Sequence, residues 1–157
     1  MKTKFKYLNV LLLILSMISS CTVYDQEGVN FEKETWSNTL AKAKAENKIV
    51  FVDAYTTWCG PCKIMDDKTF PDEKVGNFFN KNFINIKVDA EKGDGLIIAE
   101  KYKIISYPTL FFVNCDGELI HSSAGARIPE ELIELGEKVI VMVADSNKSF
   151  PSMENRY

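Results

Sequence analysis

Apolar residues follow two different periodicities along the chain, and each periodicity predicts a different kind of element. Over 31–46 they recur at helical spacing between lysines and glutamates, which predicts a helix. The continuous apolar run at 49–52 predicts a buried strand, and the alternation at 83–88 predicts a second strand. Further helices are expected at 63–68, 73–80, 96–102 and 128–143, and further strands at 109–113 and 118–122.

The order of these elements predicts an α/β fold, in which helices flank a central mixed β-sheet. The 157 residues of the chain are enough for one domain of ordinary size. This domain is expected to cover 31–144. The polar segment 145–157 is expected to form a tail without regular structure.

The first twenty residues have the pattern of a secretory signal peptide. Three lysines at positions 2, 4 and 6 precede an apolar run at 8–18, and small residues follow. This run is about half the length that a membrane-spanning helix needs. We therefore expect residues 1–20 to be removed; a retained membrane anchor is the alternative.

The residues around Cys21 resemble a bacterial lipobox, with the sequence Ile18-Ser19-Ser20-Cys21. The resemblance implies cleavage before Cys21, a lipid on that cysteine and a tether over 21–30. It also implies a protein of the bacterial cell envelope that faces the oxidising periplasm. The residue after Cys21 is not acidic, which favours the outer membrane. Plain secretion, with Cys21 as an ordinary thiol, is the alternative.

The charge of the chain argues against nucleic acid as a partner. Removal of the three lysines in 1–20 takes the formal charge from −3 to −6, and no basic patch is visible in the remaining sequence. The sequence also has no phosphate-binding glycine loop and no dinucleotide fingerprint. No cofactor is therefore expected, and electrons would have to come from another protein.

The strongest chemical signal is the segment Cys59-Gly60-Pro61-Cys62, which lies between a predicted strand and a predicted helix. A Cys-x-x-Cys pair at this place in an α/β pattern is typical of redox chemistry. Unpaired N–H groups at the start of the helix favour thiolate on Cys59, and thiolate is the attacking species in disulfide exchange. Pro61 is well suited to the first helical turn, because its missing N–H would have no partner there.

Other chemistry at these cysteines has little support in the sequence. A zinc site would need two further ligands, but no second Cys or His pair is present, so no metal is expected. A Cys–His hydrolase would need His121, the single histidine, yet this residue lies on a distant predicted strand. Cys115 lies in a predicted turn, either as an idle free thiol or as a partner in a regulatory or intermolecular disulfide.

The hexapeptide Trp58–Lys63, with the sequence WCGPCK, resembles the active site of thioredoxins. Three further positions agree in order and spacing. Asp53 lies where thioredoxins have a buried acid, Pro108 matches their cis-proline, and Gly125 matches a glycine that lines their substrate groove. The resemblance covers 49–135 and implies a thioredoxin-like fold.

The resemblance also implies a role for each residue. Cys59 would be the nucleophile, and Cys62 would resolve the mixed disulfide. Asp53 would accept the proton of Cys62 through water, the alternative being an exposed acid at a strand end. A cis-Pro108 would keep metal ions from the dithiol and leave the backbone of Tyr107 free to pair with an extended substrate. Tyr107 itself either tunes specificity or packs beside the site, and Trp58 would form the rim of the site.

Two segments and one position depart from thioredoxin. Residues 68–75 resemble the thioredoxin-like domains of membrane thiol–disulfide interchange proteins and their secreted relatives. The loop at 89–96 is longer than its thioredoxin counterpart. Either Asn85 or Lys87 corresponds to a strand lysine that lies near the buried acid of thioredoxins.

Together these features predict a monomeric enzyme that reduces protein disulfides in the cell envelope and is itself reduced by a membrane thiol reductase. Gly60 and Pro61 between the cysteines resemble those of reducing thioredoxins. Oxidation or isomerisation of disulfides is the first alternative, because the same fold supports all three directions. A lipid-anchored binding module without redox turnover is the second alternative.

Overall fold

The computed structural model describes residues 28–149, and they form one five-stranded sheet with helices on both faces. The strands are β1 (Phe31–Glu32), β2 (Ile49–Tyr55), β3 (Phe83–Asp89), β4 (Thr109–Val113) and β5 (Leu119–Ala124). Their spatial order is β1-β3-β2-β4-β5. β1 and β2 run parallel to β3, whereas β4 is antiparallel to β2 and β5. The predicted mixed sheet in a single domain is confirmed.

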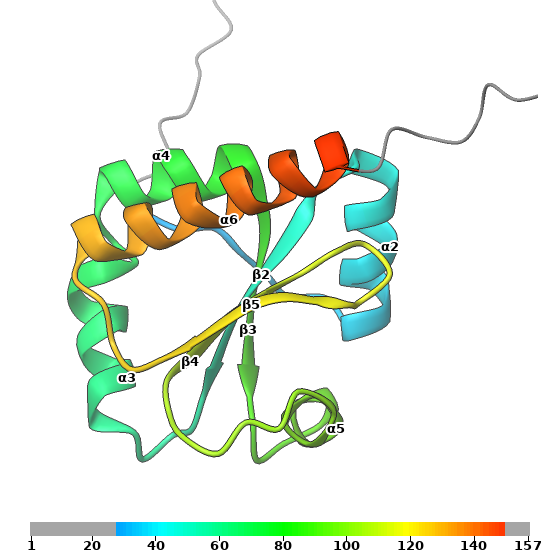
Figure 1. The fold of residues 1–157 in the computed structure, drawn as a ribbon. Coiled ribbons are helices and arrows are strands. Elements are labelled where there is room, and N and C mark those ends of the chain that lie inside the picture. The colour runs from blue at the N-terminus through cyan, green and yellow to red at the C-terminus, as the bar shows by residue number, and fades with distance from the viewer. Residues whose placement is uncertain (1–27, 150–157) are drawn as a thin grey trace, which may run out of the picture.

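The helices divide into two layers, one on each face of the sheet (Figure 1). They are α2 (Trp36–Glu46), α3 (Gly60–Ile64), η1 (Met65–Thr69), α4 (Glu73–Asn82), α5 (Asp94–Lys101) and α6 (Pro129–Ser149). One apolar core lies between the sheet and α2 with α5. A second, rich in phenylalanine, lies between the sheet and η1, α4 and α6.

Local signals in the sequence account for several helix boundaries. Thr35 caps α2 by accepting a hydrogen bond from the Asn38 N–H, and Asn47 ends the helix in the left-handed region with φ 49°. Asp72 caps α4 by accepting hydrogen bonds from the N–H groups of Lys74 and Val75. The caps thus fix where the helices on both faces begin.

The helix predicted over 31–46 begins five residues later than expected, at Trp36. Phe31 and Glu32 form β1 instead, with Phe31 paired to Asn85 of β3. The Phe31 ring packs edge-on against Phe70, with 5.0 Å between the ring centroids. Phe31 is therefore apolar because it covers the second core, and its helical spacing to Trp36 is a coincidence.

The closing helix is longer than predicted. It runs to Ser149 and so includes the first five residues of the segment expected to be an irregular tail. No glycine or proline follows Gly136 in this helix, so no helix-breaking residue ends it before Ser149. In the described part of the chain, no helix is both long and apolar enough to cross a membrane. The proposed signal peptide and Cys21 lie outside the described residues.

The helix predicted over 63–68 is present but changes its winding. α3 continues directly into the π-helical turn η1, which ends before Phe70 and Pro71. Such π-turns are rare and occur mostly at functional sites. Here the turn follows Cys62 and carries Asp66, which forms an ion pair with Lys87 at the site described next. It also carries Thr69, whose hydroxyl donates to the Arg127 carbonyl at 2.6 Å.

Candidate active site

Cys59 and Cys62 form a disulfide, with 2.04 Å between the sulfur atoms, at the point where the chain passes from β2 into α3. Cys59 is the N-cap of α3, and its sulfur accepts a hydrogen bond from the Cys62 N–H at 3.2 Å. Pro61 occupies the first turn of the helix, where no partner for its nitrogen is needed. The start of α3 therefore directs a backbone donor at Cys59, which would stabilise its thiolate after reduction.

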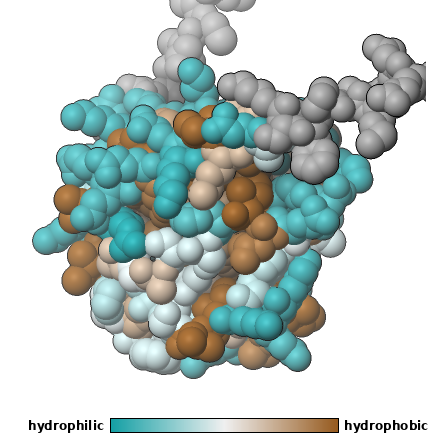
Figure 2. Space-filling view, viewed as in Figure 1, coloured by the Kyte–Doolittle hydropathy of each residue, from teal (hydrophilic) through white to brown (hydrophobic). Residues whose placement is uncertain are grey.

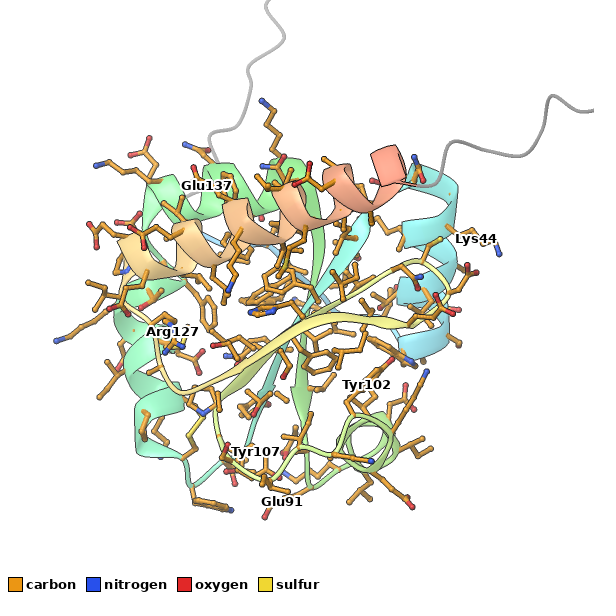
Figure 3. All side chains as sticks on the ribbon, viewed as in Figure 1. Lys44, Glu91, Tyr102, Tyr107, Arg127 and Glu137 are labelled. Carbon is orange, nitrogen blue, oxygen red and sulfur yellow. A yellow bond between two sulfur atoms is a disulfide. The ribbon has the colours of Figure 1, made fainter. Side chains whose placement is uncertain are left out.

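Trp58 lies on the rim of the site and is 65% exposed. Its indole N–H donates to a carboxylate oxygen of Glu91 at 3.0 Å. The Trp58 and Tyr107 rings meet edge to face, with 5.9 Å between their centroids. Figure 3 shows Tyr107 and Glu91 together at one end of the molecule. The longer loop after β3 thus supplies the group that holds Trp58 in place.

Pro108 and Gly125 lie at the same end of the sheet as the disulfide. The Tyr107–Pro108 peptide bond is cis, as the resemblance implied. Thr109 pairs with Ala54 near the end of β2, so Pro108 borders the segment that leads to Cys59. Gly125, with φ +95°, donates its N–H to the carbonyl of Pro108 at 2.8 Å. These contacts join the two loops that the resemblance assigns to a substrate groove.

Asp53 lies in the middle of the fold and is 1% exposed. Alternation along β2 directs it to the same face as Phe51, which packs against Met65 in the second core. Within residues 28–149, the one ion pair of this carboxylate is with Lys87. Burial raises the pKa of Asp53 to about 6, although the positive charge of Lys87 opposes the shift. Asp53 is therefore a buried acid that can exchange a proton near neutral pH.

Lys87 is the strand lysine beside this acid, which settles the choice between Asn85 and Lys87. Its Nζ lies 3.2 Å from Oδ2 of Asp53, the residue with which it pairs across β2 and β3. Lys87 also forms an ion pair with Asp66 and lies above the rings of Phe31, Tyr55 and Phe70. Asn85 instead donates to Asn30 and Asn80, away from Asp53.

The sequence analysis did not name Asp66 as a site residue, although its spacing from Cys62 indicates that it lies near the site. Asp66 follows Cys62 by four residues on the same helical stretch and therefore sits about one turn further along it. Its negative charge adds to the rise in the pKa of Asp53. Beside the disulfide, the site therefore contains the buried carboxylate of Asp53, the ammonium group of Lys87 and the more exposed carboxylate of Asp66, and Lys87 pairs with both carboxylates.

Cys115 and His121 take no part in this arrangement. Cys115 is a free thiol in the turn after Val113, and Val113 pairs with Val50 at the opposite end of β2 from Cys59. His121 lies on the edge strand β5. Within residues 28–149, no cluster of three or more Cys, His, Asp or Glu side chains could hold a metal ion.

Comparisons with known proteins agree with this geometry. The family model Thioredox_DsbH, described as a protein of unknown function (DUF255), matches residues 18–103. The chain is 32% identical to the thioredoxin-like protein slr0233 of Synechocystis sp. over 102 residues, which cover 65% of this chain and 91% of that protein. It is 31% identical to the thiol:disulfide interchange protein DsbD of Pseudoalteromonas atlantica, over 57% of this chain and 15% of that protein.

Among solved structures, the chain resembles a candidate disulphide-isomerase from Bacteroides thetaiotaomicron. The two are 38% identical, with a TM-score of 0.66, and the match covers 73% of this chain and 94% of that one. The chain therefore belongs to the DsbH (DUF255) family of the thioredoxin superfamily, and is a thioredoxin-like thiol–disulfide oxidoreductase with Cys59 and Cys62 as its redox pair.

Proposed function

We propose that this protein reduces disulfides of other proteins in the bacterial cell envelope. The observation that carries the proposal is the Cys59–Cys62 pair at the start of α3, with Asp53 buried in the layer behind it. A glycine and a proline separate the cysteines, as in the reducing thioredoxins that the motif resembles. The arrangement combines a nucleophile, a resolving thiol and a proton acceptor.

The reaction begins with the reduced form of the pair. The Cys59 thiolate attacks one sulfur of the substrate disulfide; that S–S bond breaks, a mixed disulfide forms, and the departing sulfur takes up a proton. Cys62 then passes its proton through water to Asp53 and attacks the Cys59 sulfur. This step releases the second substrate thiol and leaves the disulfide seen in the structure. Two electrons have passed from the protein to the substrate.

A second exchange of the same kind must return these electrons. The donor in the proposal is a membrane thiol reductase, since no nicotinamide or flavin fingerprint occurs in the sequence. The match to one part of DsbD, a thiol:disulfide interchange protein, supports partners that exchange disulfides with this chain.

Substrates would bind across Tyr107, the cis-Pro108 and Gly125. In this groove an extended segment of the substrate pairs with the backbone of Tyr107, in the manner of a strand added to a sheet edge. Trp58, exposed and held by Glu91, would form one wall. Cis-Pro108 would also keep metal ions away from the dithiol.

The location in the proposal rests on the first thirty residues. Residues 1–20 act as a signal peptide, and Cys21 carries a lipid. The tether expected over 21–30 is shortened to 21–27, because 28–30 form hydrogen bonds with the folded domain. The protein then faces the periplasm from the outer membrane. We also propose a monomer. Exposed apolar side chains are scattered among polar ones on the face in Figure 2, without one continuous apolar area of the kind that obligate dimers bury.

Isomerisation is the second candidate function, favoured by the description of the related Bacteroides protein. An isomerase forms and then releases mixed disulfides, so that a scrambled substrate regains its native pairing without net transfer of electrons. A reductase instead leaves its substrate with free thiols. Incubation of a scrambled protein with a stoichiometric amount of the reduced enzyme separates the two: a reductase yields free thiols, and an isomerase yields native disulfides.

The direct test of the exchange mechanism is a pair of serine variants. Cys59→Ser is expected to abolish reduction of a protein disulfide, since the attacking thiolate is lost. Cys62→Ser is expected to accumulate mixed disulfides that are visible on a non-reducing gel. Cys115→Ser serves as the matched control and should react like the wild type. Full activity of the Cys59→Ser variant would refute the mechanism, and a cellular phenotype that survives serine at both positions would favour a binding module.

A further inference from the structure

The loop between β5 and α6 is held by the side chain of Arg127. Its Nη1 donates to the carbonyls of Ala126 at 3.0 Å and Gly125 at 3.4 Å. Its Nη2 donates to the Ser123 hydroxyl at 2.7 Å and to the Ala124 carbonyl at 3.5 Å. One guanidinium group thus binds four consecutive residues, the last two of β5 and the first two of the loop that carries the groove glycine.

The backbone of Arg127 is bound to η1, the helical turn that follows the redox cysteines. The hydroxyl of Thr69, on η1, donates to the Arg127 carbonyl at 2.6 Å, and Thr69 is 2% exposed. The guanidinium also borders the groove itself. A Cβ atom placed on Gly125 would lie 3.6 Å from Nη1 of Arg127. The charge of Arg127 is therefore held next to the backbone that would receive a substrate.

All four acceptors of this guanidinium are neutral. Among the side chains of residues 28–146, no carboxylate forms an ion pair with Arg127, whereas six other ion pairs do occur there. Arg127 is partly exposed, so its guanidinium stays accessible from solvent and can accept a charged partner. The described fold supplies hydrogen bonds to Arg127 but no ion pair, and the Glu131 carboxylate next to it accepts from the Ile128 N–H instead.

We propose that Arg127 makes the groove selective for disulfides whose cysteine has an acidic residue within two positions. This inference rests on the proposed function, because it names the substrates of the same groove. An extended peptide advances about 3.3 Å per residue. A side chain one or two residues from the cysteine bound to Cys59 can therefore reach past Gly125 to the guanidinium. A substrate carboxylate there gains the attraction that no described residue provides.

The alternative is that Arg127 only braces the loop, and two variants separate bracing from charge. Arg127→Lys keeps the charge but loses the planar fork that binds several carbonyls. Arg127→Gln loses the charge but keeps an amide donor. Lys44→Gln is the matched control, since it removes one positive charge from α2, on the opposite side of the molecule from Arg127 in Figure 3.

The experiment uses the mature chain, reduced beforehand, and two disulfide peptides that differ only by Glu or Gln next to the reactive cysteine. Single-turnover rate constants need no recycling partner. For the wild type at low salt we expect the Glu peptide to react about twofold to fivefold faster, the range of a partly exposed charge pair. The preference should persist in Arg127→Lys and Lys44→Gln, disappear in Arg127→Gln, and weaken in 1 M salt.

Two results would overturn the inference while leaving the proposed function intact. One is an equal rate for both peptides with the wild type; the other is an undiminished preference in Arg127→Gln. If Arg127→Gln fails to fold, the salt dependence and the wild-type ratio still decide the question. Absence of reaction with both peptides would instead refute the proposed function, and the inference would fall with it.

Discussion

At the scale of single residues, the proposed mechanism depends on a carboxylate that the fold has placed in an unfavourable environment. Asp53 is almost completely buried, and its one ion-pair partner among the described residues is Lys87. Lys87 compensates only in part, because it also pairs with Asp66. A pKa of about 6 leaves Asp53 mostly ionised at pH 7 but able to take a proton from Cys62 during turnover.

The same burial makes Asp53 costly for stability, so we expect Asp53→Asn to stabilise the protein at neutral pH. The pKa of Asp53 is raised in the folded state from 3.8 to about 6. The folded protein therefore binds more protons than the unfolded chain, and stability falls as pH rises from about 4 to 6. Above pH 6 the variant should gain about 2–4 kcal/mol in the free energy of unfolding.

Urea denaturation of both proteins between pH 4 and pH 8 measures this difference. The gap between variant and wild type should be small at pH 4 and reach its full size by pH 7. A constant gap across the range would show that Asp53 acts through packing rather than through its charge. The variant should also release mixed disulfides more slowly, since Cys62 loses its proton acceptor.

At the scale of elements, the N-terminal segment is held to α4 by a close crossing of two glycines. A Cβ atom on Gly76 would lie 2.3 Å from the carbonyl oxygen of Gly28, and Gly28 has φ +83°. The Val29 N–H donates to the Phe70 carbonyl at 2.7 Å, which fixes the segment just before β1. This crossing places Phe31 over Lys87 and so closes one side of the site.

Gly76→Ala is therefore expected to destabilise the fold, although alanine favours helices by about 1 kcal/mol over glycine. The added methyl group must displace the backbone of Gly28, and overpacking of this kind costs about 1–3 kcal/mol. The midpoint of urea unfolding should fall. Gly60→Ala is the control, because a Cβ atom there would contact nothing within 4 Å. Equal or higher stability of Gly76→Ala would contradict the crossing.

The elements also show how far the sequence could predict the structure. Buried strands such as 49–52 were predictable because a short continuous apolar run is typical of a strand in the middle of a sheet. The start of the first helix was predicted wrongly at Phe31, because an apolar residue at helical spacing can also belong to a neighbouring strand. The end of α6 was missed because polar helical turns carry no apolar signal.

The residues of the site also include some that the sequence could predict and some that it could not. The Cys59–Cys62 pair was predictable from its motif between a strand and a helix, and the cis-Pro108 from the resemblance to thioredoxins. The choice of Lys87 over Asn85 needed the register between β2 and β3, which the sequence does not contain. The contacts of Arg127 were not predictable, because they run from a side chain to the backbone of its own loop.

At the scale of the whole molecule, the proposal depends on attachment to a membrane through Cys21, which lies outside the described residues. We expect the wild type to incorporate a labelled fatty acid and to partition into detergent, and Cys21→Ala to do neither. Cys115→Ala is the control and should behave like the wild type. Equal labelling of the wild type and Cys21→Ala would place the lipid elsewhere, and an unlabelled wild type in the aqueous phase would contradict lipidation altogether.

The reduction potential of the Cys59–Cys62 couple tests the central claim most directly. The mature protein would be equilibrated in buffers of defined redox potential, and its thiol content measured. We expect a value near roughly −270 mV, that of a reducing thioredoxin. A value between roughly −180 and −120 mV would contradict the reductase and indicate an isomerase or oxidase. Absence of any reversible couple would contradict disulfide exchange at this site.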